Sequence, residues 1–156
     1  MADWRGELFW GAGRDEVEGL TDHWTVGGHL ERSLDDGWAV GAGLEHQQAE
    51  RTTFGEVHAF ENTFATLSAT RAGLGTLALQ AEFSNDPDVK DDPLTFDVIE
   101  SEPRTWLGVV AVVVLDANHE ATVFAGERRG GTACTSGTCY LVPDFEGVEL
   151  RLSSRF

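Results

Sequence analysis

The sequence contains very little lysine and methionine and few basic residues overall. Its 156 residues include one Met and 11 Lys plus Arg, among which Lys90 is the single lysine, against 27 Asp plus Glu, so the formal net charge is −16. Nucleic-acid binding needs clustered cations that neutralise phosphates, and this balance argues against such a partner. The 18 Gly, nine Phe and five Trp, with so few of the residues that favour helices, indicate strands.

Long apolar runs are also missing. The longest candidate, LGVVAVVVL at 107–115, is far shorter than the roughly 18 residues that a transmembrane helix needs. The first residues, MADWRGEL, show no basic region followed by an apolar stretch, so no signal peptide is visible. No composition break or low-complexity linker divides the chain, and we expect a single domain over residues 1–156.

Alternating apolar and polar residues, bounded by turn residues, predict eight strands. We expect them at 4–14, 23–34, 38–47, 57–71, 76–84, 105–117, 120–129 and 147–156. The connections after the second, fourth and sixth strands are short, and those after the first, third, fifth and seventh are long. This pattern is typical of transmembrane barrels with short periplasmic turns and long outer loops. It predicts both chain ends on the periplasmic side.

Five of these strands place apolar and polar side chains on opposite faces. The apolar face holds Trp4, Leu8, Trp10; Trp24, Val26, Leu30; Trp38, Val40, Leu44; Leu77, Leu79, Phe83; and Val148, Leu150, Leu152, Phe156. The other face carries charged residues in mid-strand with glycines between them. The three remaining strands are ambiguous, because Phe64 or Phe124 would fall on the polar face and 105–117 is apolar on both faces.

A barrel with charge inside needs a surrounding medium that tolerates Trp, Leu and Phe, and lipid is such a medium. We therefore expect an all-β fold, an eight-stranded antiparallel up-and-down transmembrane β-barrel. Its narrow interior would be filled by side chains, with inward Gly leaving room for Arg and Glu, so no water channel is implied. Buried charges need partners, which predicts an interior polar network. Its members are Arg5, Glu7, His29, Glu31, Glu45, Glu82, Arg128, Glu149, Arg151 and Arg155.

The last strand, ending in LRLSSRF, resembles the β-signal that the outer-membrane assembly machinery reads in Gram-negative barrel proteins. The resemblance implies an assembly signal formed by Val148, Leu150, Leu152 and Phe156. The segment GERRGGTACTSGTCYLVPDFEGVELRLSSRF, about the last fifth of the chain, is similar to the end of large uncharacterised outer-membrane barrels. That similarity implies no activity, and it fits either a small barrel or an engineered or excised C-terminal part of a larger one.

Two surface segments suggest further chemistry. Cys134 and Cys139 in CTSGTC predict a small disulfide-closed loop in an oxidising compartment, with a free thiol pair as the alternative. The stretch 84–104 holds seven acids, which could attract Ca²⁺ or Mg²⁺, but its charge and its internal Pro favour a solvated loop without metal. These acids are Asp86, Asp88, Asp91, Asp92, Asp97, Glu100 and Glu102.

No arrangement of residues predicts catalysis or a cofactor. The five His form no HExxH pattern and no GxSxG occurs. We therefore expect a non-enzymatic barrel of the Gram-negative outer membrane, structural or active in surface interactions, without cofactor, metal or nucleic acid. Its partners would be outer-membrane lipid or detergent and the assembly machinery, with a monomer favoured. The alternatives are a lipid-modifying enzyme, a soluble lipocalin-like ligand-binding barrel and a subunit of an oligomeric pore.

Overall fold

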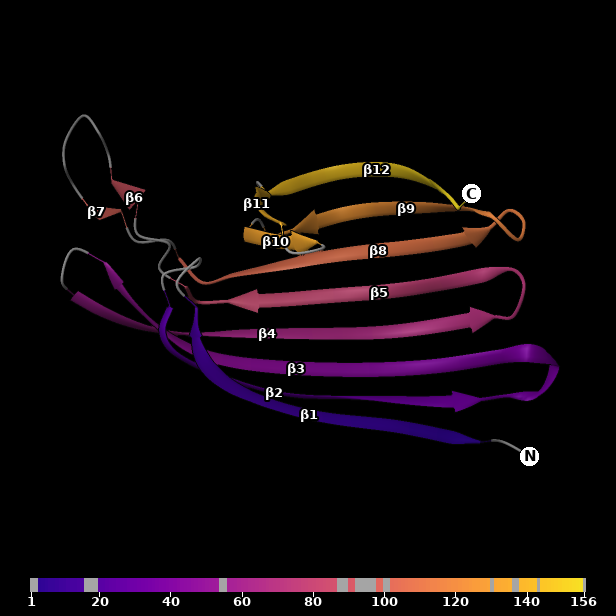
Figure 1. Ribbon diagram of the computed structural model, residues 1–156, viewed down its shortest axis with the longest axis horizontal. Coiled ribbons are helices and arrows are strands. Elements are labelled where there is room, and N and C mark those ends of the chain that lie inside the picture. The colour runs from indigo at the N-terminus through magenta and orange to yellow at the C-terminus, as the bar shows by residue number, and fades with distance from the viewer. Residues whose placement is uncertain are drawn as a thin grey trace.

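One antiparallel sheet of eight strands forms the body of the computed structural model (Figure 1). The structure describes residues 3–15, 20–53, 56–86, 90–91, 98–99, 102–129, 131–135, 138–142 and 144–155. The sheet strands are β1 (Trp4–Asp15), β2 (Leu20–Ser33), β3 (Trp38–Thr53), β4 (Glu56–Arg71), β5 (Gly75–Ser84), β8 (Arg104–Val114), β9 (His119–Arg128) and β12 (Phe145–Ser154). Each strand pairs with its neighbours in chain order. The eight predicted up-and-down strands are thereby confirmed.

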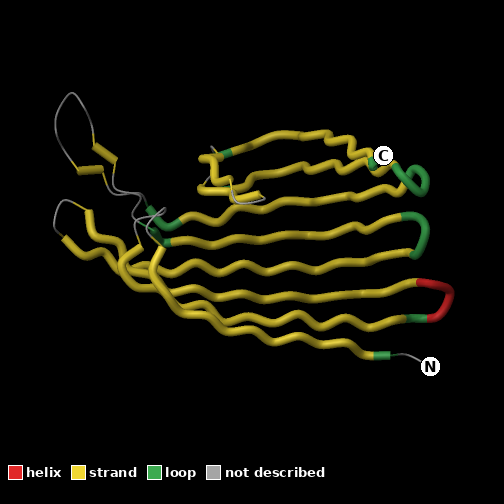
Figure 2. Tube along the Cα trace, in the orientation of Figure 1, coloured by secondary structure: helices red, strands yellow, loops and turns green. Residues whose placement is uncertain are grey.

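Two small hairpins lie in the connections, next to the loop end of the sheet (Figure 2). The pair β6 (Lys90–Asp91) and β7 (Val98–Ile99) lies between β5 and β8, and the pair β10 (Gly131–Thr135) and β11 (Thr138–Val142) lies between β9 and β12. At the opposite end, tight turns join β2 to β3, β4 to β5 and β8 to β9. The first of these turns is a 3-10 helix, Asp35–Gly37. Both chain ends lie at this turn end.

Closure into a barrel, which the strand count predicted, is not found. The sheet runs in order from β1 to β12, and no pairing joins those two strands among the described residues. Alternation fixes which face a side chain takes, whereas closure depends on the stagger and curvature accumulated over all eight strands. No local pattern in the sequence reports those two quantities.

Two of the four connections expected to be long are short. The β3–β4 ladder continues to the pair Thr53 and Glu56, and β2 begins at Leu20. Alternation of apolar residues stops near Gln47, which the sequence analysis interpreted as the end of the strand. Polar cross-strand pairs nevertheless extend the hairpin: the Asn62 amide donates to Gln47 over 2.8 Å.

The register assigns each side chain of the sheet to one of two faces. We define the polar face by Glu7, His29, Glu45, Gln80 and Glu149, and the opposite apolar face carries the predicted Trp, Leu, Val and Phe residues. The ambiguous strands are now placed. Phe64 and Phe124 lie on the polar face, and β8 directs its Leu107, Val109, Ala111 and Val113 to the apolar face.

The polar face is the sheltered face. On β8, polar-face Trp106 and Gly108 are buried while apolar-face Leu107 is exposed. A sheet that curves around one face brings the side chains of that face together, which accounts for the difference. Few described side chains are buried at all, and the buried hydrophobic residues are Ala49, Phe60, Trp106 and Phe124.

Rings, rather than the expected Arg and Glu, lie over four polar-face glycines, Gly27, Gly41, Gly43 and Gly108. A Cβ on Gly27 would collide with the Phe9 ring, and one on Gly108 would come within 2.5 Å of the Phe124 ring. An aromatic ring laid over a glycine covers backbone that would otherwise be open, a device known to stabilise sheets. His29 lies in the same way against Gly41 and Gly43.

Candidate functional site

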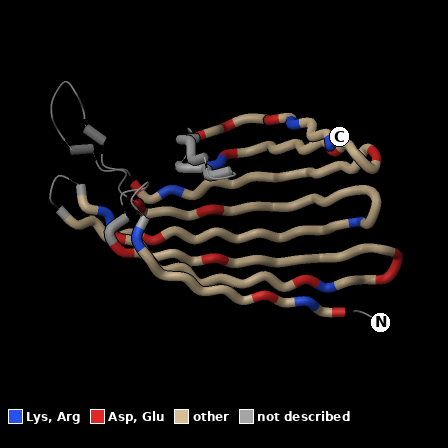
Figure 3. Tube along the Cα trace, viewed as in Figure 1, with Lys and Arg blue, Asp and Glu red and all other residues tan. Residues whose placement is uncertain are grey.

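The polar face is the candidate functional surface, because seven of the eight strands of the sheet place a described charged side chain on it. Figure 3 shows that the middle of the strands carries few charged residues. Of the ten predicted network members, the register places all but Arg155 on this face. Arg155 follows the last residue of β12, where its backbone N–H donates to the Asn118 carbonyl over 2.9 Å.

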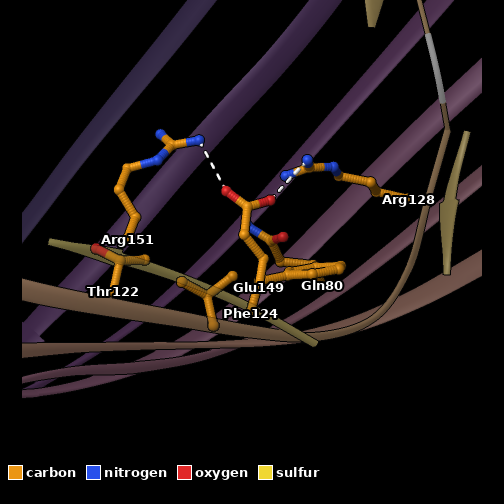
Figure 4. A pocket seen from close by; sticks show the side chains of 7 residues that line it. Gln80, Thr122, Phe124, Arg128, Glu149 and Arg151 are labelled. Carbon is orange, nitrogen blue, oxygen red and sulfur yellow. Dashed lines mark hydrogen bonds and ion pairs between the residues drawn. The ribbon is translucent and has the colours of Figure 1, made fainter. Parts of the chain in front are cut away.

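Three of these residues form an Arg–Glu–Arg triad on β9 and β12. One carboxylate oxygen of Glu149 lies 2.7 Å from Arg128 and the other lies 3.0 Å from Arg151. Figure 4 shows both guanidinium groups turned toward the same carboxylate. The Arg128 guanidinium also lies over the rings of Phe124 and Phe145, 5.5 and 5.0 Å from their centroids. Cation–π contacts of this kind hold the side chain in place.

A shallow depression of about 150 Å³ lies beside this triad. Its lining is Gln80, Val110, Thr122, Phe124, Arg128, Glu149 and Arg151. Both carboxylate oxygens of Glu149 are engaged by guanidinium groups. The triad carries one more positive than negative charge, in a chain whose formal net charge is −16.

A second triad, Arg51–Asp86–Arg129, lies at the loop end of the same face. The Asp86 carboxylate accepts from Arg51 over 2.9 Å and from Arg129 over 2.6 Å. Its side chain is 2% exposed. Arg129 also donates to the Asn62 side chain over 2.7 Å and lies 4.0 Å from Glu82. The triad therefore links β3, β4 and β5 to the residue that follows β9.

Sequence reasoning missed most of this second triad. It placed Glu82 in the interior network but assigned Asp86 to the solvated acidic loop. The only signal was weak: Asp86 lies two residues after the end of β5, and Arg129 directly follows Arg128. Strand alternation does not reveal that residues from three distant segments meet at one carboxylate.

The N-terminal members of the predicted network remain apart from both triads. No ion pair in the described part of the chain involves Arg5, Glu7, His29, Glu31 or Glu45, although all five share the polar face. Of the predicted members, Arg128, Glu149 and Arg151 form the triad on β9 and β12, and Glu82 lies 4.0 Å from Arg129 of the second triad. The five N-terminal members share the polar face without ion pairs among the described residues.

The apolar face shows a band bordered by aromatic side chains. Near the turn end lie Trp4 and Trp38, each with an arginine over its ring, Arg32 at 5.2 Å and Arg71 at 5.4 Å from the centroid. Near the loop end the band reaches Trp10, six residues along the same strand, which corresponds to about 20 Å. Beyond that row the face becomes polar, and Trp24 donates to Gln48 over 3.1 Å.

The predicted assembly-signal residues of β12 continue this band. Val148, Leu150 and Leu152 lie on the apolar face with exposed fractions of 73%, 65% and 69%. Phe156 lies outside the described residues. No helix among the residues that the structure describes has both the length and the hydrophobicity to cross a membrane.

Cys134 and Cys139 are directly opposite each other in the β10–β11 hairpin. Their side chains lie outside the part that the structure describes, so the disulfide stays a prediction. Most of the acidic loop also lies outside it. Within the described residues no three His, Cys, Asp or Glu side chains gather as metal ligands.

Comparison of the chain with models of known protein families, with curated proteins and with solved structures gives no match. The resemblance of the last strand to a β-signal therefore stays a prediction.

Proposed function

We propose that the chain forms a wall of a Gram-negative outer-membrane β-barrel, with its apolar face toward lipid and its polar face inward. In this proposal the chain is non-enzymatic, and its role is structural or in surface interactions. Its partners are outer-membrane lipid and the assembly machinery, which would read the C-terminal strand.

One observation carries the proposal: large apolar side chains are exposed across the whole apolar face. Leu8, Trp10, Leu44, Leu67 and Leu79 each have more than half of their surface exposed. A water-soluble protein rarely leaves an apolar patch of this extent uncovered. The band of about 20 Å along the strands, bordered by Trp rings at both ends, also suits a transmembrane wall, whose apolar zone lies between aromatic girdles.

A soluble lipocalin-like barrel would have the opposite arrangement. Such a barrel places its apolar residues inside, around a ligand, and its charges outside. Here the sheltered face carries both Arg–acid–Arg triads, while the apolar residues are outside. The lipid-modifying enzyme has less support, because Glu149 and Asp86 are each engaged by two arginines.

The test is refolding from urea into detergent micelles and, separately, into plain buffer, followed by electrophoresis with and without boiling. The proposal expects a compact band that shifts on boiling in the detergent sample alone. A monodisperse, folded protein in plain buffer would contradict it, because the apolar face would then have to be covered without lipid.

A further inference from the structure

We propose that a second copy of this chain closes the sheet, with β12 of each copy hydrogen-bonded antiparallel to β1 of the other. The resulting barrel would have twice the eight strands of one chain. The inference rests on the proposed function, because it is lipid that makes a free sheet edge untenable.

The edge strands of the sheet are β1 and β12. Neither β1 nor β12 has a strand on its outer side among the described residues, so each leaves alternate backbone N–H and C=O groups unpaired. In hydrocarbon no water is available to satisfy those groups, which is why membrane-spanning sheets are closed. A wall with these edges must therefore meet other strands in the membrane.

The apolar-face side chains of the two edge strands are exposed. On the apolar face Leu8 of β1 is 91% exposed and Val148 of β12 is 73% exposed, whereas Leu44 of β3, which has strands on both sides, is 59% exposed. The same apolar face would continue without interruption if a strand with matching alternation lay beside each edge.

The directions of the edge strands select a second copy of the chain as the partner. All seven pairings in the sheet are antiparallel, so β1 and β12 run in opposite directions. A β12 edge can therefore pair antiparallel with β1 of a second copy that stands in the same orientation, with the loops of both copies at one side. Antiparallel pairing of β1 with β1 would invert one copy and place its loops at the opposite side of the membrane.

The polar-face charges at the two edges are complementary. β1 presents Arg5 and Glu7, which have no ion pair among the described residues, and β12 presents Arg151, with 67% of its side chain exposed. The Glu7 carboxylate of one copy can therefore face the exposed Arg151 guanidinium of the other. Two such junctions are related by a two-fold axis along the barrel, and two-fold symmetry is the commonest arrangement of homo-oligomers.

The experiment uses chemical cross-linking of the detergent-folded chain, with Cys134→Ala and Cys139→Ala as the background. Gly11→Cys places a thiol near the loop end of β1, where a Cβ meets no atom within 4 Å. Glu146→Cys places one near the loop end of β12, at the same end of the proposed junction. Two single-thiol chains with tags of different size, one labelled on β1 and one on β12, are folded together. A long flexible bismaleimide is then added.

The inference expects a covalent dimer containing both tags, and little dimer from either single-thiol chain alone. Light scattering should give a protein mass of twice 17.0 kDa. A control chain with Glu61→Cys, toward the loop end of the central strand β4, should not cross-link to the Glu146→Cys chain.

Two results would overturn the inference while leaving the proposed function intact. One is a cross-linked monomer from a chain carrying both Gly11→Cys and Glu146→Cys, which would mean that the chain closes on itself. The other is a heat-modifiable monomer without any cross-link. Failure to fold in detergent, with folding in plain buffer, would overturn both proposals.

Discussion

At the residue scale, Asp86 joins two segments that lie far from it in the sequence. Its buried carboxylate satisfies two guanidinium groups that come from β3 and from the residue after β9. A buried ion pair adds little net stability compared with a well-packed apolar substitute, but removing one partner leaves the others without compensation. The consequence of losing Asp86 is therefore larger than the number of its bonds suggests.

Replacing Asp86 by Ala should lower the free energy of unfolding in detergent by roughly 2–4 kcal/mol, because Arg51 and Arg129 lose their shared partner. The side chains of the two arginines are about a quarter exposed, and this contact with solvent limits the decrease in the free energy of unfolding. Tryptophan fluorescence during urea titration would measure it. Asp22→Ala is the matched control, since Asp22 forms an exposed pair with Arg14 at 3.8 Å and should change stability by less than about 1 kcal/mol. Equal effects of the two substitutions would contradict the assignment.

Asp116 gives the molecule a predictable response to acid. Its carboxylate accepts from the Asn118 N–H over 2.8 Å and contacts the His119 ring at 2.8 Å. These hydrogen bonds, that from the Asn118 backbone first, lower the pKa of Asp116. A lowered acid pKa contributes stability above the ordinary value of about 3.9, and that contribution is lost as the pH falls through the lowered value.

The unfolding midpoint of Asp116→Asn should therefore lie slightly below that of the parent at pH 6, and the gap should disappear as the pH is taken well below 4. Parallel urea titrations at several pH values would follow the gap. Asp35→Asn removes an acid from another turn at the same end of the sheet and serves as the control for the loss of one charge there. A gap for Asp116→Asn that persists at the lowest pH would rule out the ionised carboxylate as its origin.

At the element scale, strands β8 and β9 approach each other through a glycine. Gly126 has a φ of +135°, and a Cβ there would collide with the Leu107 carbonyl oxygen. Both the backbone conformation and the space require glycine at this position. The strand pair depends on this one residue in a way that alternation does not reveal.

Gly126→Ala should destabilise the folded chain by roughly 1–3 kcal/mol. Gly11→Ala, in β1, should be neutral or stabilise it by up to about 1 kcal/mol, because a Cβ there meets no atom and alanine reduces the freedom of the unfolded chain. Urea titrations of both variants give the comparison. A Gly126→Ala variant as stable as Gly11→Ala would show that β8 and β9 can separate without cost.

The β10–β11 hairpin suits a disulfide, since Cys134 and Cys139 are direct partners in its ladder. The Cα atoms of directly opposed antiparallel residues lie about 4.5–5.5 Å apart, within the range that disulfides span. The chain isolated under oxidising conditions should take up no maleimide until it is reduced, as read by mass spectrometry. Labelling of two thiols before reduction would show that the pair is free.

At the scale of the whole molecule, the medium outside the sheet decides what a substitution costs. Leu67 lies on the apolar face of β4 and is 60% exposed, while its neighbour Ser68 lies on the polar face. In water an exposed leucine can become arginine at little cost. Near the middle of a bilayer the same change costs about 2–4 kcal/mol.

Leu67→Arg should therefore destabilise the chain by that amount when it is folded in lipid vesicles, whereas Ser68→Arg should have a smaller effect because its charge points inward. Urea unfolding from vesicles, followed by the boiling-dependent gel shift, would measure both. If Leu67→Arg has no effect in vesicles, the apolar face does not contact lipid.

The sequence alone determined the number of strands, their order and the face that each side chain takes on five of them, because these follow from alternation with a period of two. It could not assign the faces of β4, β8 and β9, where Phe64, Phe124 and the valines of β8 obscure the period. It also interpreted the polar continuation of β3 as a loop, because hydrogen-bonded ladders need no apolar pattern.

Only the tertiary structure decided that the sheet stays open and that Asp86 joins Arg51 and Arg129. Both depend on quantities that no short segment contains. The distance between β1 and β12 results from the curvature and stagger of every strand between them, and the Asp86 triad requires three segments, far apart in sequence, to meet at one carboxylate. Alternation is local and can be read from neighbouring residues, whereas closure and long-range ion pairing exist only after the strands have been placed side by side.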